Sequence, residues 1–164
     1  MSHGSDESLD RIRKERDLFL RLLELSSQED PTDFLERALH LVLELAGARK
    51  GYLELHDGSD GPPRWSMAVG CTDEELEGIR EAVSHGIIAR AMASGETVAT
   101  ASALTDPRFS GYQSVQVNRI EAVLCSPIGE RGSGAPLGVL YLQDRLSPGP
   151  FDSDDTRHAE LFAR

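Results

Sequence analysis

Residues 121–144 read EAVLCSPIGERGSGAPLGVLYLQD, and this stretch decides the fold. Two apolar runs, 122–128 and 137–142, have the length of β-strands and are rich in Val, Leu, Ile and Tyr. The glycines between them adopt turn conformations that other residues resist. We therefore predict an antiparallel hairpin at the centre of a sheet. Because the runs are almost continuously apolar instead of alternating, we expect protein to cover both faces of that sheet.

The composition is that of one globular domain. The chain has 164 residues, of which 39% are hydrophobic and 27% charged. The 17 basic and 28 acidic residues give a net charge of −11, which opposes direct binding of nucleic acid. No apolar run approaches the ~20 residues of a membrane-spanning helix, and residues 1–10 lack the apolar centre of a signal peptide. The two cysteines, Cys71 and Cys125, make no disulfide framework, and with no export signal they indicate a reducing cytoplasm. We therefore expect a cytoplasmic protein, and we expect no membrane as a partner.

The N-terminal part of the chain divides into two segments. Residues 1–8 are polar and are expected to be disordered. Residues 9–29 hold a predicted helix, in which apolar residues between Leu9 and Leu23 follow the spacing of a coiled-coil seam. A second apolar flank leaves two alternatives, because the helix packs either on its own domain alone or also on a second subunit. We expect the second arrangement, a parallel homodimer in which this helix and the last helix form a shared bundle.

Residues 30–164 form a predicted domain that mixes helices with strands. Its first helix has a cap at Asp30, a proline at its first position and a stop at Gly47. The further predicted elements are, in chain order, strands 51–56 and 64–69, a helix from Thr72, a helix 86–94, a strand 97–101, a structured loop 104–112, a short helix 114–120 and the central hairpin. Asp152 or Ser153 caps a last helix that has no terminator. We therefore expect that the domain is truncated within this helix and that an output domain follows it in the full-length protein.

Several motifs occur in a characteristic order along this domain. They are Ser84 before GIIARAMASGETV, DPRF at 106–109, IEAVLCSPI at 120–128, PLGVLYLQD at 136–144, and the entry into the last helix at 151–154. In this order and spacing they resemble the GAF domain, the small-molecule-sensing relative of the PAS fold. The resemblance implies an α+β fold with a central antiparallel sheet of five to six strands. It also implies N- and C-terminal helices on one face and pocket-forming helices and loops on the other.

The resemblance further implies a pocket for an unidentified small molecule on the face opposite the terminal helices. The residues implied to wall it come from one helix, the loop 104–112 and the hairpin: Ile87, Ala91, Met92, Arg108, Phe109, Tyr112, Cys125 and Tyr141. Arg108 keeps two interpretations, since it pairs either with an anionic group of the ligand or with Asp106 or another carboxylate. Tyr112 either covers the pocket mouth or packs. Cys125 lies in an apolar strand, which indicates an inert buried residue instead of a redox centre.

The better-known activities of GAF proteins find no matching residues in this chain. Members that reduce methionine sulfoxide use several spaced cysteines, and cyclic-nucleotide-binding members carry an Asn-Lys-Phe-Asp-Glu constellation. Bilin-binding members attach the chromophore through a cysteine close to a histidine. Neither Cys71 nor Cys125 lies in such a context, and no His, Cys, Asp or Glu residues have metal-ligand spacing. We therefore expect no catalysis and no metal, and we leave the cofactor unassigned.

Two functions of different classes remain. In the first, the domain binds a small molecule and relays the signal through its terminal helices to an output domain. The form VLCSPI…PLGVLYLQD…FDSDD most resembles GAF domains of sigma-54-dependent AAA+ transcriptional activators, with histidine kinases next. In the second, the pocket is closed and the domain is a dimerisation and relay element of a histidine kinase or a related protein. A ligand-sized cavity lined by Arg108, Phe109 and Tyr112 favours the first function, and a face filled by side chains favours the second. A methionine sulfoxide reductase-like enzyme is a distant third.

Overall fold

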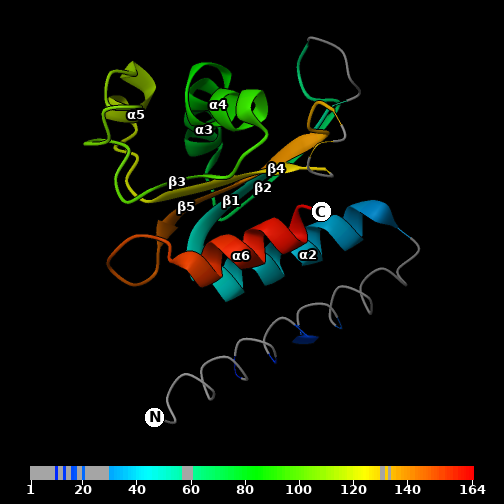
Figure 1. Cartoon of the computed structure of the whole chain (residues 1–164). Helices are drawn as coiled ribbons and strands as arrows, with labels where there is room; N and C mark the ends of the chain where they lie inside the picture. Colours follow the sequence, from blue (N-terminus) through cyan, green and yellow to red (C-terminus); the bar gives the residue numbers. More distant parts are fainter. Residues whose placement is uncertain are drawn as a thin grey trace, which may run out of the picture.

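The computed structural model of the chain is built on one five-stranded antiparallel sheet (Figure 1). The structure describes residues 10, 13, 16, 17, 20, 30–56, 61–129, 132 and 134–164. The predicted disordered segment 1–8 lies outside these residues. The predicted helix 9–29 also lies outside them, apart from the single positions just named.

The predicted hairpin lies at the centre of the sheet. In spatial order the strands are β2 (Trp65–Val69), β1 (Ala48–Leu55), β5 (Gly138–Arg145), β4 (Val123–Ile128) and β3 (Val98–Thr100). Every neighbouring pair is antiparallel, and β5 is the middle strand. The first strand begins three residues earlier than its apolar pattern predicts, because Ala48 and Lys50 pair with Arg145 and Gln143 at the end of β5.

Helices cover both faces of this sheet, as the continuous apolar runs predict (Figure 1). One face carries α2 (Pro31–Ala46) and α6 (Ser153–Phe162). The other face carries α3 (Asp73–His85), α4 (Ile87–Ser94) and the short α5 (Gln113–Val117). The α+β fold and the common face of its first and last helices are therefore confirmed. None of the helices in the described part of the chain combines the length and apolarity needed to cross a membrane.

Capping interactions explain where α2 begins and ends and where α6 begins. The Asp30 side chain accepts a hydrogen bond from the Thr32 amide at 2.8 Å, and Gly47 ends α2 in the left-handed conformation with φ 58°. At the start of α6, Asp152 and Asp155 form a capping box in which each side chain accepts the other's backbone N–H, at 2.8 and 2.9 Å. These caps fix both helices where their apolar sides meet the sheet.

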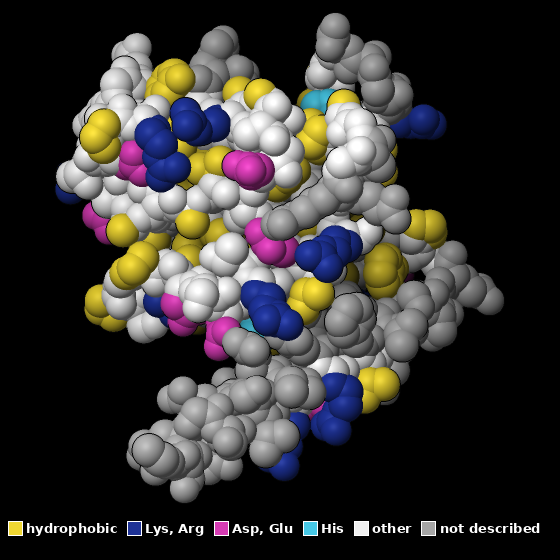
Figure 2. All heavy atoms as spheres, in the orientation of Figure 1, with side chains coloured by type: hydrophobic (Ala, Val, Ile, Leu, Met, Phe, Trp, Pro, Cys, Tyr) yellow, Lys and Arg dark blue, Asp and Glu magenta, His cyan; other side chains and the backbone are white. Residues whose placement is uncertain are grey.

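Two separate cores fill the two sides of the sheet. Strand alternation divides neighbouring residues between them, so that Cys125 faces α4 while Leu124 faces α2 and α6. The buried residues on the α3–α5 side, which we call the upper core, are Tyr52, Ile79, Ile87, Ile88, Ala91, Val98, Ala103, Phe109, Val115, Ile120, Val123, Cys125, Val139 and Tyr141. On the surface, hydrophobic side chains are scattered among acidic and basic ones over the face drawn in Figure 2.

Two glycines in the sheet let backbone and helix approach closely. A Cβ at Gly51 would meet the side chain of Leu43. Because glycine has no side chain, α2 can pack closely on β1 at this position. A Cβ at Gly138 would meet the backbone carbonyl of Glu54 on the neighbouring strand. The β1–β5 pairing therefore depends on glycine at position 138.

Gly138→Ala should lower the free energy of unfolding by at least about 2 kcal/mol, because backbone cannot move aside as a flexible side chain can. Urea denaturation measures this as a lower midpoint with an unchanged slope. Gly111→Ala is the matched control, since no atom lies within 4 Å of a Cβ built there. Equal effects of the two substitutions would show that the close approach at Gly138 does not constrain the sheet.

Candidate functional site

The face implied to bind a ligand is filled by side chains. Ile87, Phe109, Cys125 and Tyr141 are all buried and belong to the upper core, and Met92 packs against that core from α4. Tyr112 lies at the margin, where 39% of it is exposed. The structure therefore gathers most of the implied pocket residues in one place, but there they contact one another.

The loop 102–112 is fixed by an aspartate–arginine pair. The Arg108 guanidinium donates to both carboxylate oxygens of Asp106, with Nε 3.0 Å from Oδ1 and Nη2 2.7 Å from Oδ2. The backbone N–H of Arg108 also donates to Asp106 Oδ1 at 3.0 Å. The guanidinium lies 4.9 Å from the centre of the Phe109 ring. This ring is buried in the upper core and anchors the loop there. The DPRF motif thus folds the loop onto the sheet.

Arg108 also reaches the edge of the sheet. Its Nη2 donates to the carbonyl of Ala99, at 3.0 Å, in the edge strand β3. Edge carbonyls otherwise remain open to pairing with other chains. Of the two interpretations of Arg108 that the sequence leaves open, the structure shows pairing with Asp106. An anionic ligand at this guanidinium would have to compete with that carboxylate.

This pair changes the acidity of Asp106. Hydrogen bonds from the Arg108 side chain outweigh the opposing effect of burial and hold the pKa of Asp106 well below its usual range. The Asp106 side chain is 13% exposed, whereas the Arg108 side chain is 40% exposed. The carboxylate is thus charged and mostly enclosed.

Sequence reasoning missed a buried carboxylate on the upper face of β1. Glu54 is only 2% exposed, and its Oε2 accepts a hydrogen bond from the Tyr52 hydroxyl at 2.9 Å. Its Oε1 lies 2.9 Å from His56 Nε2. Burial, followed by the charge of Glu54, raises the pKa of Tyr52 to about 12, so the tyrosine stays a hydrogen-bond donor. The alternation of three polar residues at positions 52, 54 and 56 could have revealed this network, because it places them on one strand face.

A second polar group lies at the opposite end of β1. Lys50 Nζ is 2.9 Å from Glu75 Oε1 in the first turn of α3 and 3.3 Å from Asp144 Oδ2 in β5. Burial lowers the pKa of Lys50, but the hydrogen bonds and charges of Glu75 and Asp144 outweigh it and raise that pKa overall. The lysine thus joins α3 to two strands of the sheet.

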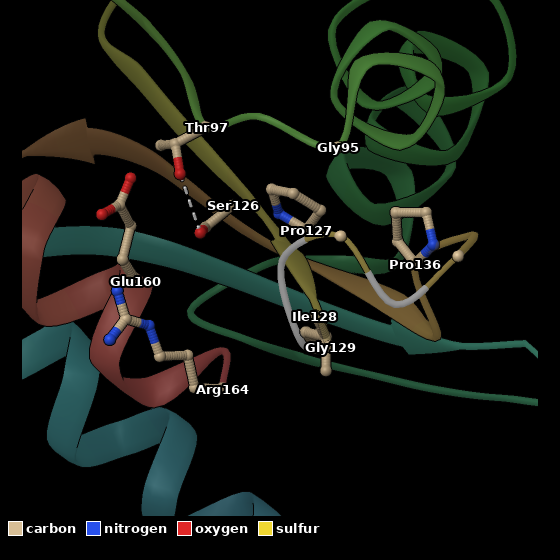
Figure 3. A pocket seen from close by; sticks show the side chains of 11 residues that line it. Gly95, Thr97, Ser126, Pro127, Ile128, Gly129, Pro136, Glu160 and Arg164 are labelled. Carbon is tan, nitrogen blue, oxygen red and sulfur yellow. Dashed lines mark hydrogen bonds between the residues drawn. The ribbon is translucent and has the colours of Figure 1, made fainter.

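A small cleft opens where the hairpin meets the end of α6 (Figure 3). Thr97 and Ser126 line it and are joined by a hydrogen bond, with their hydroxyl oxygens 3.0 Å apart, and the C-terminal segment contributes Glu160 and Arg164. The cavity is about 50 Å³, which holds a few waters but no metabolite. An adjoining groove of about 780 Å³ is wide enough for a ligand but open to solvent, and Met92 is the only implied pocket residue that lines it.

The two cysteines are poor nucleophiles in this structure. Cys125 is completely buried, and burial raises its pKa well above the ordinary value. Cys71 is partly buried and free, and burial, followed by the charge of Glu75, raises its pKa as well. Within the described ranges, no group of three His, Cys, Asp or Glu residues is arranged to hold a metal ion.

Comparisons with known proteins agree with the fold. The family model described as GAF domain matches residues 28–164. No curated protein matches the chain.

Three solved structures illustrate the likeness. The GAF domain from an Acinetobacter phosphoenolpyruvate-protein phosphotransferase is 18% identical, with a TM-score of 0.65 over 99% of this chain and 90% of that one. Residues 122 to 287 of a methyl-accepting chemotaxis protein are 17% identical, with a TM-score of 0.64 over 87% and 89%. The free methionine-R-sulfoxide reductase from Neisseria meningitidis, in complex with its substrate, is 18% identical, with a TM-score of 0.62 over 89% and 81%. At these identities the likeness shows the fold alone.

Asp106→Asn should lower the free energy of unfolding by about 1–2 kcal/mol at pH 7, because it breaks charge-assisted hydrogen bonds of a mostly buried group. The folded-state pKa of Asp106 lies below its unfolded value, so its contribution is complete above about pH 4 and is lost as the pH falls through the folded pKa. Urea denaturation measures the free energy of unfolding of both proteins at pH 7 and pH 3. The difference between Asp106→Asn and the unmodified protein should be smaller at pH 3.

The matched control for this prediction is Glu96→Gln, which removes an exposed carboxylate beyond the end of α4. It should change the unfolding free energy little at either pH. If the unfolding free energies of Asp106→Asn and the unmodified protein differ by the same amount at both pH values, the assigned role of the Asp106 charge is wrong.

Proposed function

This chain belongs to the GAF domain family, and we propose that it works as the regulatory sensory module of a bacterial signalling protein. Two of the structures with its fold come from a phosphotransferase and from a methyl-accepting chemotaxis protein, which supports a regulatory setting. In this proposal the module converts a change on the α3–α5 side into a change at its terminal helices.

One observation carries this proposal: the central hairpin contacts both sides of the domain. Cys125 packs in the upper core while its neighbour Leu124 packs against the α2 and α6 side. At the end of β4, the backbone N–H of Gly129 donates to the Ala163 carbonyl at the end of α6, at 2.9 Å. A shift of β4 therefore reaches α6 through backbone as well as through packing.

We further propose that an unidentified small molecule binds on the upper side, between α4 and the loop 102–112. Most of the residues that the family resemblance implies lie there together, and Tyr52 of the same core donates a hydrogen bond to the buried Glu54. Because side chains fill this side, a ligand would bind a minor, opened arrangement. Its effect on the population cannot exceed its difference in affinity between the two arrangements.

A second candidate function is favoured by the same filled core. If the opened arrangement is never populated, the domain is a ligand-free dimerisation and relay element, as in a histidine kinase or a related protein. The close packing of Phe109, Cys125 and Tyr141 supports this candidate.

The wider setting is also a proposal. The motifs of the hairpin and of the α6 entry support a module N-terminal to a sigma-54-dependent AAA+ transcriptional activator. The seam pattern in residues 9–29 supports a homodimer. The free state of both cysteines supports a reducing, cytoplasmic location.

Hydrogen exchange can test the sensory proposal. A compound selected from carboxylate- and phosphate-bearing metabolites by thermal shift should slow amide exchange in residues 86–94 and 104–112, since those segments would cover it. Arg108→Ala should weaken binding of an anionic compound by about 1.5–3 kcal/mol, because a charged hydrogen bond is lost. Slower exchange confined to the N-terminal residues 9–25 would place the ligand elsewhere.

The relay candidate is tested without a ligand by Phe109→Leu, which loosens the upper core. Faster exchange at the Gly129 amide, as well as in the loop 102–112, is expected if the hairpin transmits the change. Val117→Ala on the exposed side of α5 is the control. Faster exchange in the loop alone would show that the two sides of the sheet are not coupled.

We also propose that the domain is not an enzyme, although a reductase shares its fold. Both thiols have raised pKa values, and the thiolate is the form that attacks. With iodoacetamide at pH 7, Cys71 should react more slowly than glutathione, and Cys125 should react only in urea. Rapid labelling of Cys71, together with reduction of free methionine sulfoxide that Cys71→Ser abolishes, would overturn this assignment.

A further inference from the structure

A ligand-sized cleft lies at the opposite end of the sheet from the hairpin turn. It opens between the end of β5, the loop that leads to α6 (146–151, the orange loop in Figure 1) and the loop after α5. Its volume is about 430 Å³. The residues that line it are Arg49, Ala101, Arg119, Glu121, Ala122, Asp144, Arg145, Ser147, Pro148, Gly149 and Pro150. The residues implied to bind the sensory ligand are not among them.

Three arginines from three separate segments meet in this cleft, which we call the arginine cleft. Arg49 lies in β1, Arg119 follows α5 and Arg145 ends β5. Arg49 and Arg145 are 96 positions apart in sequence, yet Arg49 Nε donates to the Arg145 carbonyl at 3.2 Å. The chain has a net charge of −11, so three arginines lining one cleft have the opposite sign to the overall charge.

The acidic residues of the cleft offset this charge only in part. Asp144 is already bound by Lys50 Nζ at 3.3 Å and by the Gln143 side chain at 3.3 Å. Glu121 supplies one further carboxylate. Among the residues that line the cleft, the three arginines outnumber the two carboxylates, and Asp155 beyond the cleft lies 3.6 Å from one of them, Arg145.

The backbone of the cleft adopts an unusual conformation. Among the described residues, only Arg119 (φ 50°) and Asp144 (φ 58°) have positive φ without being glycine, and both line this cleft. A side chain in this region costs roughly 1–2 kcal/mol, most for residues other than Asn and Asp. Such positions are concentrated at binding sites, where the surrounding structure holds them. Arg119 thus lines the cleft from a backbone conformation that the surrounding structure must hold.

Arg145 connects the cleft to the start of α6. Its Nη1 donates to the Pro150 carbonyl at 2.6 Å, and its Nη2 lies 3.6 Å from Asp155 Oδ2 in the capping box of α6. Its Nε is buried and has no hydrogen-bond partner among the described residues. The guanidinium is therefore held at two of its nitrogens, while its Nε is buried without a partner in the described part of the chain.

We propose that the arginine cleft binds an oxyanion group, a phosphate or a carboxylate, of a small molecule. The planar fork of a guanidinium matches the oxygens of both groups, and the cleft has the volume of a small-molecule site. This site is separate from the proposed sensory pocket on the upper side. It can therefore exist whether or not that pocket binds a ligand.

The test uses the whole 164-residue chain, labelled with nitrogen-15, and three probes: inorganic phosphate, pyrophosphate and citrate, each at constant ionic strength. Saturable shifts are expected at the amides of Arg119, Ala122, Ser147 and Gly149. Arg119→Gln should weaken the binding about tenfold, because one charge-assisted hydrogen bond is lost. Arg119→Asn is a second variant that keeps the left-handed backbone favourable.

Arg90→Gln is the matched control, since it removes the same charge from an exposed position on α4. It should leave the affinity unchanged. Binding of phosphate and pyrophosphate but not citrate would identify a phosphate site, and the reverse would identify a carboxylate site. Shifts that never saturate, or an equal loss of affinity in Arg90→Gln and Arg119→Gln, would overturn the proposal because they indicate general charge attraction.

Discussion

The rest of the structure depends on β5, the strand that pairs with β1 on one side and β4 on the other. Because side chains alternate along it, Leu140 and Leu142 face α2 and α6, while Val139 and Tyr141 face the upper core. A one-residue slip in its register would exchange these two sets, so burial on both sides fixes the pairing. Glycine at position 138 then allows β1 to come close at the start of β5.

This double burial leaves little room for polar groups, and several charged side chains near the sheet have specific partners. Glu54 accepts a hydrogen bond from Tyr52 and lies 2.9 Å from His56 Nε2, and Lys50 contacts two carboxylates from other elements. Arg108 satisfies Asp106 and an edge carbonyl at the same time. An unpaired buried donor or acceptor costs about 1–3 kcal/mol, and among the described residues two buried side-chain nitrogens, Arg145 Nε and His158 Nδ1, have no partner.

The parts of this fold that were predictable from sequence are those set by neighbours along the chain. The caps of α2 and α6 and the pairing of Arg108 with Asp106 join residues within a few positions, and the hairpin joins two strands that follow one another in the chain. The meeting of Arg49 with Arg145, 96 positions apart, depends on strand register, which no local pattern in the sequence specifies. The filling of the upper core was also unpredictable, because it depends on how Phe109 and Tyr141 pack across the sheet and not on their spacing.

The contacts at the two ends of α6 bear on how a signal could leave the domain. At its first turn the helix is held by Arg145, 3.6 Å from Asp155, and at its end by the bond from Gly129 to Ala163 at 2.9 Å. The first contact is long for an ion pair, whereas the second has good hydrogen-bond length. An oxyanion in the arginine cleft would compete with Asp155 for Arg145, and an opened upper core would act on Gly129 through β4. Each event would release one end of α6 while the other stays fixed, so the helix would pivot about opposite ends. Two inputs would thereby give two distinct positions of the same helix, one of them through a shift of β4.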